Sequence, residues 1–189
     1  MTPLRRGGRA DGAAGTRLVW SVADGRRGAR WREVASDGEG VIRSILLEVA
    51  PTGRPERLEV TTRAGLLTLH PEPDASALHG NVVTPDGIRH LAFAWSADHG
   101  LLVAGSPVAA AVLVGRLAHV RVGDTVETDV VRMADDLEPT AERWAVARPR
   151  ARAWSLRPTG DRSVDAIELE LDAMGLPSGV AARSWPLER

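Results

Sequence analysis

The chain has 189 residues, of which 43% are hydrophobic and 26% are charged, and its formal net charge is −1. These values are typical of one globular domain, and the near-zero charge argues against a general affinity for nucleic acids. All 24 basic residues are arginines and cysteine is absent. This excludes lysine and thiolate nucleophiles, disulfides and cysteine metal sites.

Residues 1–15 are rich in glycine, arginine and alanine and have no hydrophobic periodicity. We therefore predict a disordered tail over residues 1–15 and a single β domain over residues 16–189. The longest apolar run, residues 108–114, is far too short to cross a bilayer, and the N-terminal segment has no apolar signal sequence. The sequence thus predicts a cytoplasmic protein without a membrane span.

From residue 16 onward, apolar and polar residues mostly alternate, which is the pattern of half-buried strands. The pattern is clearest at residues 165–171, where isoleucine and leucine would face the core and two glutamates would face water. Further strands are predicted at residues 41–49, 57–62, 66–70, 118–122 and 126–132.

Asp-Gly pairs at residues 24–25, 37–38 and 86–87 predict hairpin turns between these strands. We interpret Ser106-Pro107 as a bend that enters a further strand. Residues 134–146 could form a turn or two of helix, but Pro139 interrupts them. We expect roughly eleven to thirteen short strands and an all-β, mainly antiparallel fold.

The sequence contains no recognisable catalytic or metal-binding motif. The five histidines lack the spacings that place two imidazoles on one side of an element, and no Gly-x-Ser-x-Gly motif occurs. The acidic residues 135, 136 and 138 are interpreted as a solvated loop. We therefore predict no metal, no cofactor and no enzymatic activity. For an enzyme acting on small amphiphiles, Asp98 and His99 would be the residues to test.

Three segments carry a family resemblance. They are SPVAAAVLVGRL at residues 106–117, EPTAERW at residues 138–144 and ELDAMGLP at residues 170–177. In this order they resemble the second half of a family of bacterial soluble β-proteins described as glycolipid-binding, formerly a domain of unknown function. That family has a Ser/Thr-Pro step leading to Arg-Leu, then Gln-Arg-Tyr, then Asp-x-x-Gly-Leu/Phe. The resemblance covers residues 100–189 by motif and residues 16–99 by general pattern.

The chain departs from the family at polar positions. Asp-x-Asp before the Ser-Pro step is replaced by residues 99–102, His-Gly-Leu-Leu, and an asparagine in the following loop is replaced by alanines 109–111. Only Arg116 remains of two arginines, and Gln-Arg-Tyr becomes Glu142-Arg143-Trp144. These changes leave open whether the family's pocket is retained.

The resemblance implies a strongly curved sheet, a barrel or half-barrel, that encloses an apolar hollow. Our leading hypothesis is non-enzymatic binding of a lipid or glycolipid-like amphiphile in that hollow. The family motifs favour Arg116, Arg143 and Trp144 as ligand-binding residues, and Trp95 and Trp154 would add aromatic surface.

The alternative is an interaction or scaffold module whose core is filled by its own side chains and which takes no ligand. An exposed apolar patch or sheet edge would then pair with a partner or with a second copy. Whether the protein is a monomer or a homodimer stays open at this stage.

Overall fold

The structure is a computed structural model that describes residues 4–11, 15–160, 166–180 and 187–188. These ranges contain fifteen strands and one helix, α1 (Pro107–Arg116). One sheet contains β1 (Leu4–Asp11), β2 (Arg17–Gly25), β3 (Gly28–Asp37), β4 (Gly40–Val49), β5 (Pro55–Thr62), β6 (Gly65–Pro71), β7 (Ala77–Thr84), β8 (Gly87–Ala94) and β15 (Leu187–Glu188). The other contains β9 (Gly100–Val103), β10 (Thr125–Met133), β11 (Pro139–Arg150), β12 (Ala153–Pro158), β13 (Ile167–Leu171) and β14 (Pro177–Val180).

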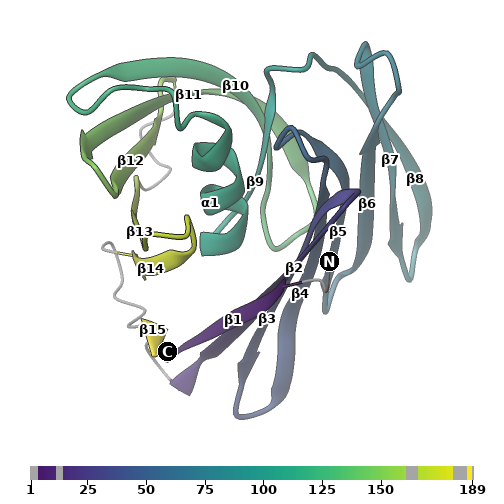
Figure 1. The fold of residues 1–189 in the computed structure, drawn as a ribbon. Coiled ribbons are helices and arrows are strands. Elements are labelled where there is room, and N and C mark those ends of the chain that lie inside the picture. Colours follow the sequence, from purple (N-terminus) through teal and green to yellow (C-terminus); the bar gives the residue numbers. More distant parts are fainter. Residues whose placement is uncertain (1–3, 12–14, 161–165, 181–186, 189) are drawn as a thin grey trace.

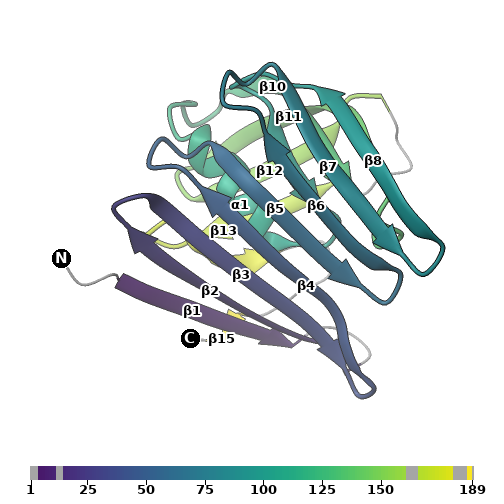
Figure 2. The same cartoon turned by 90° about the vertical axis from the view of Figure 1, so that its right-hand side faces the viewer.

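The first sheet has nine antiparallel strands in the order β15-β1-β2-β3-β4-β5-β6-β7-β8. β1–β8 form a meander, in which neighbouring strands in the chain are neighbours in the sheet, as short hairpin connections allow, and β15 pairs with β1 at the edge. Figure 2 shows this sheet as a broad twisted layer in front of α1 and the second sheet. We call the face toward α1 the inner face.

The second sheet is a six-stranded half-barrel in the order β14-β13-β12-β11-β10-β9. It curls around α1, which lies inside the curve (Figure 1). Its pairs are antiparallel except β9 and β10, which are parallel. A parallel pair needs a crossover connection, and α1 lies within that connection. The prediction of an all-β, mainly antiparallel fold with a half-barrel is confirmed.

The core has two parts, one on each side of α1. One side of the helix, with Val108, Ala109 and Val112, packs in the cluster formed by the inner face of the nine-stranded sheet. The opposite side, with Ala110 and Leu113, packs in the cluster formed by the curled sheet. The helix is thus buried between two sheets, and the hollow that the curled sheet would enclose is filled by α1.

The structure differs from the sequence-based expectation at the N-terminus. Residues 4–11, within the expected disordered tail, form β1, which pairs with β2 along its whole length. Residues 1–3 and 12–14 lie outside the described residues. The segment contains few apolar residues, so its order comes from a ladder of backbone hydrogen bonds to a neighbouring strand, which composition does not reveal.

The interpretation of Ser106-Pro107 as the entry to a strand was wrong, because this step begins α1. The Ser106 hydroxyl accepts a hydrogen bond from the amide of Ala109 at 3.1 Å, and Pro107 occupies the first turn. Serine at the cap and proline just inside the helix are favoured helix starts. The following residues, Val108–Val114, are all buried, so the helix lacks the amphipathic pattern by which it would be recognised.

The strand predicted at residues 118–122 was also wrong, because this segment is a turn after α1. Its carbonyl oxygens at Ala118 and Val120 accept hydrogen bonds from Nη1 of Arg148 at 3.0 and 2.9 Å. These backbone groups therefore need no neighbouring strand. His119 is exposed. The strands predicted at 57–62, 66–70 and 126–132 lie within β5, β6 and β10.

The strand predicted at residues 165–171 appears as β13, although residue 165 lies outside the described residues. No helix of the described residues is long and apolar enough to cross a membrane.

A substitution at Gly80 would test how closely the strands of the nine-stranded sheet pack. A Cβ atom at Gly80 would lie 1.9 Å from the backbone oxygen of Thr68 and 2.7 Å from Cδ2 of Leu69, whereas a Cβ at Gly38 would meet nothing within 4 Å. We expect Gly80→Ala to lower the free energy of unfolding by about 2–3 kcal/mol and Gly38→Ala to leave it nearly unchanged. Urea denaturation of both variants checks this, and equal stabilities would contradict the packing described here.

Candidate functional site

Two charged side chains lie on the apolar inner face of the nine-stranded sheet. Glu33 on β3 has no exposed surface, and Arg43 on β4 is 7% exposed. Strand geometry places them there, because every second residue of a strand points to the same face. Glu33 lies two positions from the buried Trp31 and Ala35, and Arg43 lies two positions before the buried Ile45. Their burial requires partners that compensate the loss of water.

Glu33, Arg43 and Ser106 form a hydrogen-bonded group that we call the clasp. One carboxylate oxygen of Glu33 accepts from Nη2 of Arg43 at 3.1 Å. The other accepts from the hydroxyl of Ser106 at 2.7 Å and from the amide of Val108 at 3.4 Å. The carboxylate of β3 thus lies at the N-terminus of α1, where the helix dipole and free amides favour negative charge.

Arg43 joins the sheet to the segments on both sides of α1 in the sequence. Its Nη1 donates to the carbonyl oxygen of Ala104, just before the helix, and to Oδ1 of Asp135 at 3.2 Å. The backbone oxygen of Asp135 also accepts from the hydroxyl of Thr62 at 3.2 Å. The clasp therefore connects β3 and β4 with the start of α1 and with the loop after β10.

Burial is the largest influence on the ionisation of Glu33. Desolvation raises the pKa of its carboxyl above the ordinary 4.5, although Arg43, Ser106 and the amide of Val108 each act in the opposite direction. The folded protein therefore holds a proton on Glu33 more tightly than the unfolded chain does.

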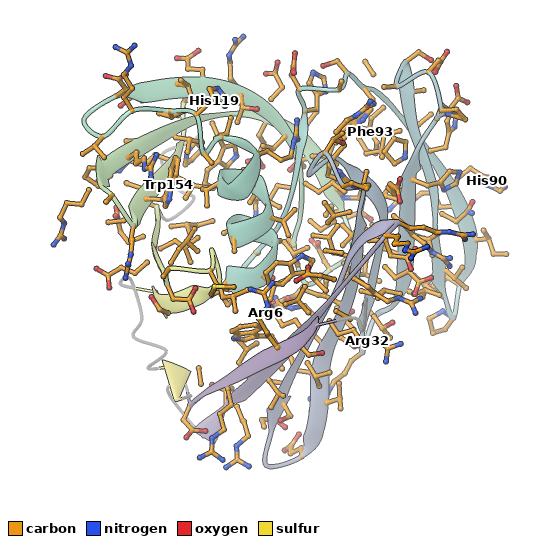
Figure 3. All side chains as sticks on the ribbon, in the orientation of Figure 1. Arg6, Arg32, His90, Phe93, His119 and Trp154 are labelled. Carbon is orange, nitrogen blue, oxygen red and sulfur yellow. The ribbon has the colours of Figure 1, made fainter. Side chains whose placement is uncertain are left out.

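A second polar group lies on the inner face at β1 and β2. Arg6 donates to the carboxylate of Asp24 through Nη2. Trp20 is 4% exposed and stacks at a tilt on Trp31, with ring centroids 6.2 Å apart. The indole of Trp20 lies over Gly8, where a Cβ atom would approach its ring within 2.7 Å. Figure 3 shows Arg6 on the side of β1 that faces α1.

Four buried side-chain nitrogens have no hydrogen-bond partner among the described residues: Nε and Nη1 of Arg6, Nε1 of Trp20 and Nε of Arg43. All four are donors, and all come from β1, β2 and β4. An unsatisfied buried donor costs about 1–3 kcal/mol, so their grouping in one part of one face calls for an explanation.

Two of the five predicted ligand-binding residues lie in the core between α1 and the curled sheet. Trp144 is fully buried and Trp154 is 3% exposed. Nε1 of Trp144 donates to Glu142 at 2.8 Å, and the guanidinium of Arg148 lies 5.0 Å from the ring centre of Trp154. Figure 3 shows Trp154 between the curled sheet and α1.

The other three predicted residues lie around the loop between β8 and β9. The ring of Trp95 meets that of His99 edge-on at 5.4 Å, and Arg116 donates to the carbonyl oxygen of His99. Asp129 lies 3.8 Å from Nε2 of His99 and 3.9 Å from Nε of Arg143. Desolvation lowers the pKa of Arg116. The structure thus brings Trp95, Arg116 and Arg143 near one loop, and a ligand-binding role for all five residues stays a prediction.

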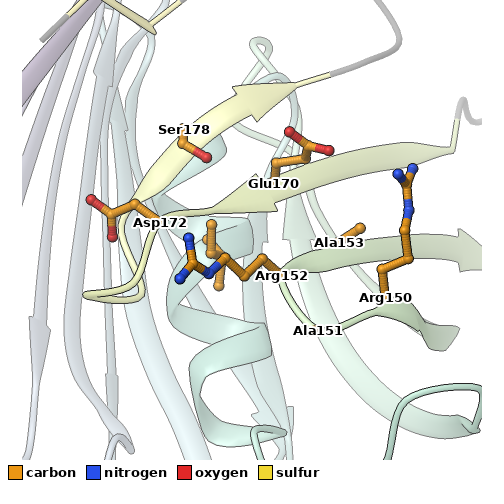
Figure 4. A pocket seen from close by; sticks show the side chains of 8 residues that line it. Arg150, Ala151, Arg152, Ala153, Glu170, Asp172 and Ser178 are labelled. Atoms are coloured by element: carbon orange, nitrogen blue, oxygen red, sulfur yellow. The ribbon is translucent and has the colours of Figure 1, made fainter.

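Three depressions on the surface are lined mainly by polar residues and contain no tryptophan. One, of about 380 Å³, lies beside Arg150, Arg152, Glu170 and Asp172 (Figure 4). A second, of about 350 Å³, lies at the β7–β8 hairpin. The third, of about 540 Å³, lies at the β2–β3 hairpin, and Asp24, the partner of Arg6, forms part of its wall.

Within the described part of the chain, no three histidine, aspartate or glutamate side chains are placed to hold a metal ion.

The sequence analysis did not identify Arg6, Trp20, Glu33 and Arg43 as site residues. The alternation of residues along a strand could have identified two of them. Glu33 and Arg43 occupy positions that face the core, between positions that face outward.

We expect the wild-type protein to lose stability relative to Glu33→Gln as the pH rises from about 4.5. The reason is that a raised carboxyl pKa contributes stability that is present below the unfolded pKa and lost as pH rises through the folded pKa. Urea denaturation of both proteins across the pH range checks the sign, because all other carboxyls are common to the two. A difference that grows in favour of the wild type with rising pH would mean that Arg43 outweighs burial.

No protein-family model and no curated protein matches the chain. A crystal structure at 1.80 Å resolution of a DUF1089 family protein from Pseudomonas aeruginosa is similar in fold. The TM-score is 0.58 and the sequence identity 16%, over 97% of this chain and 91% of that chain. At this identity the likeness establishes the fold alone, which this chain therefore shares with a bacterial β-protein of an uncharacterised family.

Proposed function

We propose that the protein is a non-enzymatic binding protein for a lipid or glycolipid-like amphiphile, held along the inner face of the nine-stranded sheet next to α1. The observation that carries the proposal is the division of this face into two halves. The half formed by β5–β8 contributes buried apolar residues: Leu58, Val60, Leu67, Leu69, Leu78, Val82 and Leu91. The half formed by β1–β4 also contributes buried apolar residues, among them Leu18, Val22, Ile45 and Leu47. In addition it carries Glu33 and Arg43 of the clasp, Arg6 and the four unpaired donors.

An amphiphile has the same division. Its chains would lie against β5–β8, where apolar burial contributes about 25 cal/mol per Å², and its polar part would reach the donors of β1–β4. The interior is packed with the protein's own side chains, so binding requires α1 and the loop after β10 to move away from the sheet. The clasp is the polar attachment that such a movement breaks.

The resemblance noted for residues 106–117 also supports this proposal. This segment forms α1 and its C-terminal residues, which pack on the inner face through Val108, Ala109 and Val112. Residues 138–144 and 170–177, the other two segments, belong to the sheet that curls around the same helix.

Native mass spectrometry of the purified protein, followed by organic extraction, tests the proposal. We expect a stoichiometric adduct of lipid mass, or an adduct formed on incubation with a panel of acylglycerols, glycolipids and phospholipids. Val108→Arg would place a charge between α1 and the sheet and should abolish the adduct, whereas Val122→Arg, at a 55% exposed site, is the matched control. A protein that remains free of ligand throughout the panel would contradict the proposal.

A second candidate function is an interaction module that pairs with a second copy of the chain. The specific observation in its favour is the edge strand β8, which ends the nine-stranded sheet. Ile88 on β8 is 66% exposed and its cross-strand neighbour Val83 is 39% exposed. Proline and β-bulges are two features that protect edge strands from pairing with another chain. β8 has neither: it contains no proline, and its pairing with β7 shows no register shift.

The Ile88→Lys variant tests this candidate. If β8 pairs with a second copy, light scattering after size exclusion should give a dimer for the wild type and a monomer for Ile88→Lys, because a lysine at the edge opposes strand pairing. Val41→Lys, at a 58% exposed position on β4 away from the edge, should leave the dimer intact. A wild type that is monomeric at all accessible concentrations would rule this candidate out.

A further inference from the structure

Arg6 and Trp20 together offer three of the four unpaired buried donors. Arg6 lies opposite Val22 in the β1–β2 ladder and Trp20 lies opposite Gly8, so the two side chains are diagonal neighbours on one face of adjacent strands. The Nε and Nη1 atoms of Arg6 have no hydrogen-bond partner among the described residues. The same holds for Nε1 of Trp20, a residue that is 4% exposed. Unpaired donors on neighbouring side chains fit a group that accepts hydrogen bonds.

The charges around this pair are already balanced. Arg6 faces Asp24, and Glu33, which lies opposite Trp20 in the β2–β3 ladder, faces Arg43. A phosphate or carboxylate placed here would add an unpaired negative charge near two carboxylates, at a cost in desolvation and repulsion. A sugar hydroxyl can accept from these donors, but its own hydrogen needs an acceptor as well. An uncharged carbonyl oxygen adds no charge and only accepts hydrogen bonds.

We propose that Arg6 and Trp20 form a binding site for the carbonyl oxygen of a neutral acyl ester or amide, so that the ligand class is an uncharged acyl lipid such as an acylglycerol. This inference rests on the proposed function. The ester oxygen would accept from the indole N–H of Trp20 and from the guanidinium of Arg6, and the acyl chain would run toward the apolar half of the inner face.

The approach to the site follows from the depression at the β2–β3 hairpin. Asp24 belongs to its wall and also holds Arg6. The polar part of a glycerol lipid could therefore remain in the depression of about 540 Å³ while its ester reaches inward past Asp24. Gly8, beside the indole, leaves Trp20 in place because no side chain competes for its position.

The test compares three probes with the same monounsaturated chain: 1-monooleoylglycerol, the corresponding 1-O-alkyl ether of glycerol, and oleate. Wild-type protein should bind the ester about five- to tenfold more tightly than the ether, because the ether lacks the carbonyl acceptor and one or two hydrogen bonds are lost. It should also bind the ester more tightly than oleate. Isothermal titration or fluorescence competition measures the three affinities.

Trp20→Phe keeps an aromatic ring, although a smaller one, and removes the N–H, so the ratio of ester to ether affinity should fall toward one. Trp31→Phe removes a neighbouring indole N–H that is not among the unpaired donors and should preserve the ratio. Near-ultraviolet circular dichroism shows whether each variant keeps its packing, and Arg6→Met supplies a second variant if Trp20→Phe does not fold.

Each outcome bears on a different claim. If wild type binds neither ester nor ether, the present inference is overturned; the proposed function fails as well only if the protein also remains free of ligand with glycolipids and phospholipids. If it binds both equally and Trp20→Phe changes nothing, lipid binding stands, the donors bind only water, and the present inference is overturned. Tighter binding of oleate than of the ester would overturn the choice of an uncharged ligand.

Discussion

The position of α1 depends on one glutamate and one arginine that are buried between apolar surfaces. Loss of Arg43 would leave the buried charge of Glu33 uncompensated, at a cost of about 3–5 kcal/mol. Loss of Glu33 would leave Arg43 with Asp135 as its one carboxylate partner among the described residues. Because Glu33 also accepts from Ser106 and Val108 at the helix start, β3, β4 and α1 are held in one relative arrangement. Apolar packing alone would tolerate sliding between these surfaces, since it has no direction.

The helix held by this pair fills the curled sheet. Its residues 107–114 are buried on all sides, and opposite sides of the helix belong to two separate core clusters. The half-barrel is thus present, while the hollow expected inside it is occupied by the chain itself. The other large apolar surface is the inner face of the larger sheet, where the buried charged side chains and the unpaired donors lie on β1–β4.

Strands could be predicted where one face of the strand is buried and the other is exposed to solvent. In β13, for example, Leu169 is 1% exposed and its neighbour Glu170 is exposed. This two-residue period is local and can be read directly from the sequence. The helix α1 was not predictable in this way, because burial between two layers removes the polar face that gives a helix its period. β1 was missed because its residues are mostly glycine and arginine and its order depends on a partner strand.

The candidate site was harder to predict for a related reason. A glutamate at position 33 has the chemistry of a solvent-exposed residue, and its burial is possible only because Ser106, 73 positions away, donates to it. Arg43 likewise depends on Ala104 and on Asp135, 92 positions away. Such compensation arises from tertiary contacts. Trp144, a motif residue, and Trp154 were predicted to bind a ligand, and their place in the core could not be inferred from spacing.

A crystal structure of the protein with an acylglycerol brominated along its chain tests the central claim most directly. The account predicts anomalous bromine peaks between α1 and the inner face of β5–β8, with the ester near Trp20 and the contact between Glu33 and Ser106 lengthened or broken. Bromine peaks confined to the outer surface, with Glu33, Arg43 and Ser106 in their present contacts, would contradict it.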